Sequence, residues 1–196
     1  MEKNMKLILG SSSKWRKGIL EDAGYKFDVM EADIDEKAIR SDNYELLPLL
    51  IARAKAEPLL KKIKDSSILI TSDQVAVYED ELREKPENTK EAERFLKSYS
   101  VHPVKSITAV VVTDTNTAEK VEGVDIAEVH FKKIPSKIIN KFIEDGMAFS
   151  CAGGFAVSHP LLKPFVERID GDLDSVMGLP MKLTNKLLRN LKFPNK

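Results

Sequence analysis

The stretch Lys6-Leu-Ile-Leu-Gly10-Ser-Ser-Ser-Lys-Trp-Arg16 decides the fold class, because it joins a strand, a turn and the start of a helix. Its first five residues are a short apolar run of the kind found in buried strands. Ser11–Ser13 can cap the helix that Ile19 and Leu20 indicate by their spacing, and Gly24 ends that helix. Backbone N–H groups at such a helix start point into the turn, where they favour a bound anion.

The remaining chain mixes strands and helices without a linker or a repeat. Apolar runs and alternation predict strands over Phe27–Glu31, Ser67–Ile70, Val75–Tyr78, Ile107–Thr113 and Val121–Phe131, the last two as an antiparallel pair. Helical spacing predicts helices over Tyr44–Ile63, Thr89–Tyr99, Pro135–Glu144 and Met181–Leu191. We expect Pro58 to kink or end its helix, Thr89 to cap the next one, and Thr71–Gln74 to separate two strands. These elements predict an α/β protein, as a single domain over residues 1–196 with two lobes around a central cleft.

Composition excludes several classes of protein. The chain of 196 residues is 42% hydrophobic, which is too apolar for intrinsic disorder. Its 31 Lys and Arg balance 31 Asp and Glu, so we expect neither a nucleic acid polymer nor a membrane as partner. One Cys forms no internal disulfide, and no signal peptide or apolar span is present, so we expect a cytoplasmic protein.

Carboxylates follow two of the expected strands. Asp73 comes directly after an apolar strand, so it lies either at a strand end where ligands bind or in a simple turn. Asp33, Asp35 and Glu36 form a short acidic cluster after another strand. Such a cluster suits a hard cation such as Mg²⁺, or it is a solvated loop that caps a helix.

Basic residues complete the candidate site. Lys55 interrupts a helix of small apolar residues, and Lys85 is held extended by the proline that follows it. Each has an ordinary alternative, a solvated helix face for Lys55 and turn chemistry for Lys85. Together with Arg16, the serine turn and the carboxylates, they predict a site for a polyphosphate and its metal.

Seven short motifs, in order and at similar spacing, resemble those of the Maf proteins from Lys6 to about Leu191. They are Gly10-Ser-Ser-Ser-Lys-Trp-Arg16, Asp33-Ile-Asp-Glu36, Ala52-Arg-Ala-Lys-Ala56, Ser72-Asp-Gln-Val75, Glu84-Lys-Pro86, Ala152-Gly-Gly154 and Asp174-Ser-Val-Met-Gly-Leu-Pro180. Maf proteins are nucleoside triphosphate pyrophosphatases related in fold to the inosine triphosphate pyrophosphatases. The resemblance therefore implies a mixed, twisted sheet flanked by helices.

The resemblance also implies a role for each matching residue. In the implied reaction, water attacks the α-phosphorus of a nucleoside triphosphate. The products are the monophosphate and pyrophosphate, and the cofactor is Mg²⁺ or Mn²⁺. The implied roles are phosphate binding for Ser11, Ser13, Arg16, Lys55 and Lys85, metal binding for Glu36 and Asp73, and proton acceptance for Asp73.

The resemblance connects substrate choice with Trp15, Gln74 and Ser158, and with the context of Cys151. Trp15, Gln74 and the context of Cys151 resemble the Maf group that acts on 7-methyl-GTP, so this nucleotide is favoured. Trp15 could stack on a cationic base, or it is a core aromatic residue that anchors the first helix. Ser158 stands where that group usually has an acidic residue, and Ser100–Pro103 lacks a Gly-Arg pair common in the family. Neither departure favours dTTP, and a dTTP and UTP pyrophosphatase of the same family is the alternative.

Further alternatives concern the biological role and the assembly. The resemblance includes proteins connected with septum formation, so a non-catalytic, nucleotide-binding regulator of cell division stays open. We expect a homodimer, although the apolar face of the terminal helix could equally pack within the chain. We assign no catalytic role to His102, His130 or His159, and Cys151 is interpreted as a small buried residue.

Overall fold

The computed structural model describes residues 5–193 and confirms the mixed α/β class. The strands are β1 (Lys6–Leu9), β2 (Asp28–Val29), β3 (Ser67–Tyr78), β4 (Glu81–Arg83), β5 (Val104–Asp114), β6 (Lys120–Phe131) and β7 (Val166–Asp170). The α-helices are α1 (Lys14–Asp22), α2 (Leu46–Lys62), α3 (Thr89–Ser98), α4 (Ser136–Glu144), α5 (Leu173–Val176) and α6 (Met181–Asn190). Short 3₁₀ turns are η1 (Glu36–Ala38), η2 (Met147–Ser150), η3 (Ala152–Gly154) and η4 (Lys163–Phe165).

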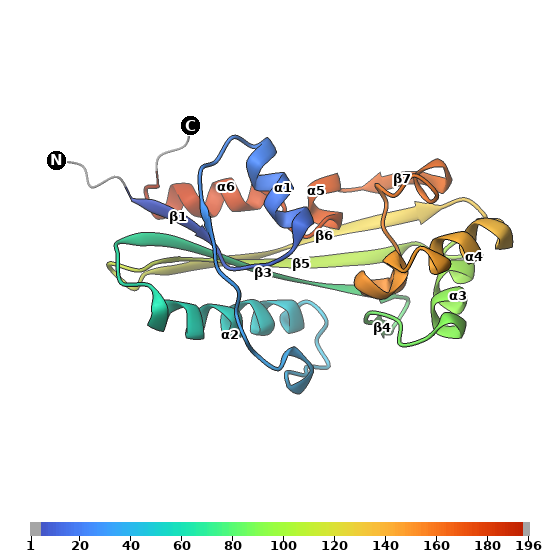
Figure 1. Ribbon diagram of the computed structural model, residues 1–196, viewed down its shortest axis with the longest axis horizontal. Helices are drawn as coiled ribbons and strands as arrows, with labels where there is room; N and C mark the ends of the chain where they lie inside the picture. The colour runs from blue at the N-terminus through green and yellow to red at the C-terminus, as the bar shows by residue number, and fades with distance from the viewer. Residues whose placement is uncertain (1–4, 194–196) are drawn as a thin grey trace. The chain divides into compact units, whose positions relative to one another are not determined.

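The strands form one mixed sheet of seven strands in the order β2-β1-β3-β5-β6-β7, with β4 paired to β3 (Figure 1). β1 pairs in parallel with both β2 and β3, whereas β4 and β7 pair antiparallel with β3 and β6. β5 and β6 are neighbours joined by a short turn, in which the Asp114 amide donates to the Glu119 carbonyl at 2.9 Å. Parallel strands at the start of the chain place β1 and its serine turn beside β3.

The described chain divides into two compact units, each built from separate stretches of sequence. The first holds the residues up to Asp73, Thr108–Asp125 and those from Gly178 onward, and the second holds Gln74–Ile107 and Ile126–Met177. β3, β5 and β6 contribute residues to both units. The single domain and the central cleft expected from the sequence stay predictions.

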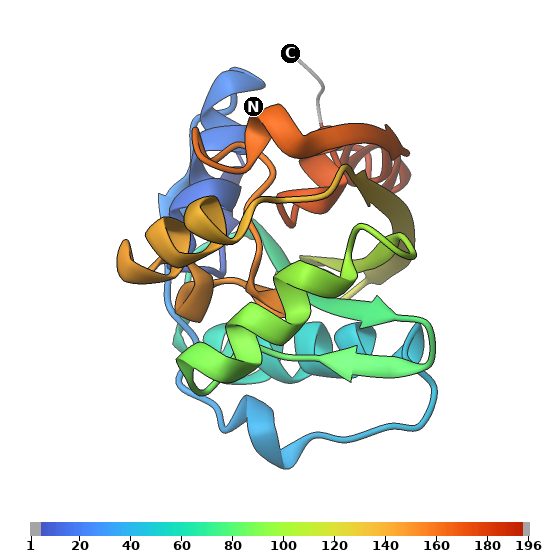
Figure 2. The same cartoon turned by 90° about the vertical axis from the view of Figure 1, so that its right-hand side faces the viewer.

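In the first unit, helices cover both faces of the strands. Figures 1 and 2 show α1 and α6 on one face and α2 on the other. Leu59 of α2 packs with Ile8 of β1 and Leu69 of β3. Gly10 allows this close approach, because a Cβ there would lie 2.6 Å from Leu59 Cδ1. The turn after β1 is therefore held tightly against α2.

The second unit has its own apolar core around Tyr99 and Phe142, which are almost fully buried. α3 and α4 pack side by side over this core (Figure 1). Tyr99 donates a hydrogen bond from its hydroxyl to the Gly153 carbonyl at 2.6 Å, and burial raises the pKa of this hydroxyl. The bond ties the glycine pair of η3 to the residue that follows α3.

The sequence prediction of a break at Thr71–Gln74 was wrong, because β3 runs without interruption through these four polar residues. Each polar side chain has a partner inside the protein. Thr71 donates to the Ala52 carbonyl, Ser72 to the Gly178 carbonyl and Gln74 to Ser106, while Asp73 binds Lys55. Buried polar groups that are paired in this way cost little, so the strand continues. Asp73 consequently lies inside a strand, neither at its end nor in a turn.

Three smaller expectations also need correction or sharpening. α2 does not end at Pro58 but continues to Lys62. Asn88, and not Thr89, caps α3, because its side-chain oxygen accepts from the Glu91 amide. The apolar face of α6 packs within the chain, with Leu187 and Leu188 buried. No helix within residues 5–193 is long and apolar enough to cross a membrane.

Candidate functional site

The serine turn and the start of α1 form the first part of the site. Ser13 caps α1, and its hydroxyl accepts from the Arg16 amide at 3.4 Å. The buried Ser11 hydroxyl accepts from the Ser13 amide at 3.2 Å and from the Arg16 Nη1 at 3.3 Å. The Arg16 Nε donates to the Gly178 carbonyl at 2.9 Å. The turn predicted to bind phosphate therefore holds one guanidinium in a defined position.

Lys55 joins the two carboxylates that the sequence singled out. It lies on α2, and its Nζ is 2.6 Å from Asp73 Oδ1 on β3 and 3.0 Å from Glu36 Oε1 at the start of η1. Lys55 and Asp73 are buried, while Glu36 is half-exposed in its side chain. The small residues Ala52 and Ala56 beside Lys55 are fully buried, as the pattern of α2 indicates. One ammonium group thus gathers two carboxylates from distant parts of the sequence.

Charges in this part of the molecule influence one another. Burial raises the pKa of Asp73, while the charges of Lys55 and Arg16 lower it and that of Glu36 raises it. Burial lowers the pKa of Arg16, and Asp73 and Glu36 raise it. The two acids and two bases therefore form one electrostatic cluster, which we call the Lys55 cluster: Arg16, Glu36, Lys55 and Asp73. Its partly dehydrated charges suit an ionic ligand.

The chemistry of these donors fits a divalent cation. Carboxylate oxygens are the ligands that Mg²⁺ prefers, and Glu36 and Asp73 converge on one cationic group already. Asp33 is exposed and Asp35 caps η1 by accepting from the Lys37 amide, so the acidic cluster serves two purposes. Asp35 therefore provides the helix cap that the sequence suggested for this loop, and Glu36 forms the ion pair with Lys55.

A different group of potential ligands lies in the second unit. Glu128, His130 and Asp170 have ligand atoms within 4.8 Å of one another. Arg168 already occupies this place, with its Nη2 3.1 Å from His130 Nε2 and its Nε 3.1 Å from Asp170 Oδ1. We interpret this group as an ion-pair network between β6 and β7, because a guanidinium supplies the positive charge.

Lys85 lies in the second unit, beside the glycine pair. It is exposed and follows Glu84, whose carbonyl accepts from the Gly153 amide at 3.1 Å. Burial raises the pKa of the Cys151 thiol, and the charge of Lys85 lowers it. A half-buried thiol with a raised pKa is a poor nucleophile, so Cys151 fits the structural interpretation.

The three residues predicted to choose the base have different surroundings. Trp15 on α1 is 38% exposed, so it is not the core anchor that was its alternative. Gln74 Nε2 lies 2.5 Å from the Ser106 hydroxyl and 2.7 Å from the Val176 carbonyl. Its amide nitrogen is engaged within the protein, which leaves the amide oxygen as the atom suited to a base contact. Ser158 is half-buried in the segment after η3.

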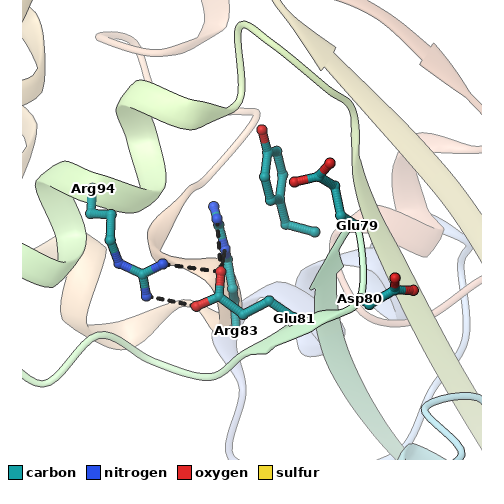
Figure 3. Close-up of a pocket in the computed structure, with 6 residues that line it drawn as sticks. Glu79, Asp80, Glu81, Arg83 and Arg94 are labelled. Atoms are coloured by element: carbon teal, nitrogen blue, oxygen red, sulfur yellow. Dashed lines mark hydrogen bonds and ion pairs between the residues drawn. The ribbon is translucent and has the colours of Figure 1, made fainter.

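A concave surface of the second unit is lined by Tyr78, Glu79, Asp80, Glu81, Arg83 and Arg94. Figure 3 shows both arginines reaching Glu81. The hydrogen bond from Arg94, followed by that from Arg83, lowers the pKa of Glu81. Because its basic groups are paired to an acid, this surface lacks the excess positive charge that a polyphosphate needs. None of its lining residues belongs to the seven motifs quoted above.

Sequence reasoning did not single out Ser72 and Gly178 individually. Both lie inside motifs quoted above, but they carry no charge and their contact joins residues far apart in the chain. The usable signal for Ser72 was a polar run flanked on both sides by apolar strand residues, since a buried hydroxyl needs a partner.

Comparison with known proteins places these residues in a family. The model of the family described as Maf-like protein matches residues 6–191. A protein of Dictyostelium discoideum named 7-methyl-GTP pyrophosphatase is 48% identical over 93% of this chain and 95% of its own. Relatives at 34% identity are a 7-methyl-GTP pyrophosphatase of Idiomarina loihiensis (93% of each chain) and a dTTP/UTP pyrophosphatase of Vibrio vulnificus (93% of this chain and 97% of its own). The chain therefore belongs to the Maf-like protein family.

Proposed function

We propose that this protein is a nucleoside triphosphate pyrophosphatase, a hydrolase acting on an acid anhydride. It cleaves the bond between the α- and β-phosphates to give a nucleoside monophosphate and pyrophosphate. The observation that carries the proposal is the Lys55 cluster, in which a buried lysine holds two carboxylates beside an arginine at a serine-capped helix start. The names of relatives that cover 93% of the chain support the same reaction.

In the proposed reaction the helix start and the basic groups bind the triphosphate. Ser11, Ser13 and Arg16 contact phosphate oxygens, and Lys55 and Lys85 offset further negative charge. Asp73 orients a water molecule for attack on the α-phosphorus and accepts its proton, and pyrophosphate leaves as the bond to the α-phosphorus breaks. The raised pKa of Asp73 makes it a stronger base than an ordinary carboxylate once it is ionised.

A divalent cation, Mg²⁺ or Mn²⁺, is the proposed cofactor, with Glu36 and Asp73 as its protein ligands. When bound, such an ion polarises water and neutralises charge on the phosphates. Lys55 pairs with the same two carboxylates, so Glu36 and Asp73 would hold the ion in place of this ammonium group, which would then be available to the phosphates. The cluster would then exchange an internal ion pair for contacts with the metal and substrate.

We further propose 7-methyl-GTP as the preferred nucleotide. The relative at 48% identity is named for this activity, whereas relatives at 34% identity carry both names. The exposed ring of Trp15 is suited to stack on a cationic base, which contributes about 0.5–2 kcal/mol. A panel of 7-methyl-GTP, GTP, CTP, dTTP and UTP with Mg²⁺ or Mn²⁺, assayed for pyrophosphate release, tests the choice. Higher kcat/KM for dTTP or UTP than for 7-methyl-GTP would select the alternative.

The role of Asp73 has a separate test. Asp73→Asn should abolish most turnover and leave nucleotide binding measurable by calorimetry, because the amide cannot accept the proton. Asp65→Asn is the matched control, since the exposed Asp65 side chain pairs only with Lys6 among the described residues. Near-normal turnover by Asp73→Asn removes it from the mechanism. Binding without turnover in the wild type would favour the nucleotide-binding regulator.

Assembly and location belong to the proposal as well. We propose that the protein is a cytoplasmic homodimer. We also propose that it is connected with septum formation, as are some proteins that it resembles. The apolar face of α6 is used within the chain, so a dimer would need another surface. Molar mass from light scattering at several concentrations tests this point, and a mass that stays at one chain contradicts the dimer.

A further inference from the structure

The Gly178 carbonyl is shared by two hydrogen-bond donors in the first unit. Arg16 Nε lies 2.9 Å from it, and the Ser72 hydroxyl also lies 2.9 Å from it. Arg16 comes from α1, Ser72 from β3, and Gly178 from the segment between α5 and α6. Three distant parts of the sequence therefore meet at one backbone oxygen.

The geometry of this carbonyl depends on glycine. Gly178 has a φ of 99°, in the region that other residues rarely adopt. The backbone conformation at 178 helps to direct the carbonyl that Arg16 and Ser72 share. Ser72 is fully buried, and its hydroxyl satisfies its donor by bonding to this oxygen.

Arg16 keeps donors for a ligand despite these bonds. Its Nε is bound to Gly178 and its Nη1 to Ser11, while its Nη2 has no hydrogen-bond partner in residues 5–193. A guanidinium fixed on one side presents its other side in a defined direction, and less rotamer freedom is lost when a phosphate binds. The anchor therefore determines where the remaining donors point.

We propose that the Gly178 carbonyl positions Arg16 for the triphosphate, and that Ser72 is a positioning residue that acts through this carbonyl. The inference rests on the proposed function and extends it, because it assigns a task to the Asp174–Pro180 motif and to a serine whose hydroxyl bonds to a backbone carbonyl. Neither Ser72 nor Gly178 has a charged side chain that could bind phosphate directly.

The test is a double-mutant cycle on pyrophosphate binding, measured by calorimetry, with kcat and KM measured in parallel. Ser72→Ala and Gly178→Ala are each made in the wild type and in Arg16→Lys, which lacks the guanidinium Nε. Thr71→Val is the control for Ser72→Ala, because Thr71 is equally buried and donates to a backbone carbonyl at 2.8 Å without involving Arg16. Gly146→Ala controls for backbone strain, since Gly146 has a φ of 83° and open space around it.

We expect Ser72→Ala to weaken pyrophosphate binding about three- to tenfold in the wild type, from the loss of one hydrogen bond. Gly178→Ala should weaken it at least about tenfold, because the anchor is displaced. Both effects should fall below about twofold in Arg16→Lys, and neither control should change binding by more than about twofold. KM should rise more than kcat falls.

Equal losses in the two backgrounds would overturn the proposal, as would a loss in Thr71→Val as large as that in Ser72→Ala. If Ser72→Ala fails to fold, the Gly178→Ala cycle decides alone. Failure of the proposed function can be distinguished from failure of the positioning role. If the wild type binds pyrophosphate but hydrolyses no nucleotide, the proposed function fails while the double-mutant cycle on pyrophosphate binding can still be measured. A wild type that does not bind pyrophosphate overturns the positioning role directly.

Discussion

Replacing Lys55 by methionine should raise the pKa of Asp73. The Lys55 ammonium lies 2.6 Å from the Asp73 carboxylate, and its charge is the largest influence that opposes burial. At this distance two unit charges attract by about 6 kcal/mol at an effective dielectric constant of about 20, most of which offsets the cost of dehydrating them. A cation this close typically changes a carboxyl pKa by about 1–3 pH units. We therefore expect a further rise of that size in Lys55→Met, which keeps the bulk of the side chain.

The titration is best followed by NMR of ¹³C-labelled aspartate carboxyl groups in metal-free protein. Asp73 is identified by the signal that Asp73→Asn removes. Lys61→Met is the control, because Lys61 is exposed on the same helix and makes no contact with Asp73. In the wild type, Asp73 should titrate above the ordinary value of 3.8, in Lys61→Met it should be unchanged, and in Lys55→Met it should be higher.

Two results would refute this reasoning. An Asp73 pKa below 3.8 in the wild type would mean that the nearby positive charges outweigh burial. An unchanged pKa in Lys55→Met would mean that the ion pair does not govern the carboxylate. If Lys55→Met retains measurable turnover, the acidic limb of its pH profile of kcat/KM should move to higher pH, because this limb reports the pKa of the essential base of the free enzyme.

Three other predictions concern stability and selectivity. Folding raises the pKa of Asp73, so protonated Asp73 favours the native state below pH 3.8, and this contribution is lost as the pH rises through the folded pKa. The unfolding free energy of Asp73→Asn, measured by urea titration, should therefore increase relative to that of the wild type as the pH rises toward 7. A difference that stays constant with pH contradicts this prediction. Gly10→Ala should destabilise by about 1–3 kcal/mol, because its Cβ would lie 2.6 Å from Leu59, whereas Gly18→Ala, with open space inside α1, should stabilise by about 0.5–1 kcal/mol. Trp15→Ala should leave the melting temperature nearly unchanged but raise KM for 7-methyl-GTP more than for GTP, and equal increases would exclude selective stacking.

Local signals predicted the start of the molecule well. An apolar strand, a serine turn and a helix with apolar spacing follow one another within β1 and α1, and each is specified by neighbouring residues. The cap by Ser13 and the stop at Gly24 lie where the sequence indicates them. Such elements depend on contacts between residues only a few positions apart, so a single sequence contains the necessary information.

The course of β3 could not be predicted in this way. Four consecutive polar residues usually end a strand, and here they continue it because each finds a partner on another part of the chain. The partners of Ser72 and Asp73 are 106 and 18 residues away in the chain. Spacing along the sequence carries no record of such contacts. The same reason explains why Lys55, Glu36 and Asp73 could be singled out as candidates but not placed around one ammonium group.

The most direct test of the proposed reaction is product analysis of 7-methyl-GTP hydrolysis in ¹⁸O-water with Mg²⁺ or Mn²⁺. Attack of water on the α-phosphorus predicts 7-methyl-GMP that carries one ¹⁸O and pyrophosphate that carries none, as read by mass spectrometry. Release of orthophosphate, or ¹⁸O in the pyrophosphate instead of the monophosphate, would contradict the account.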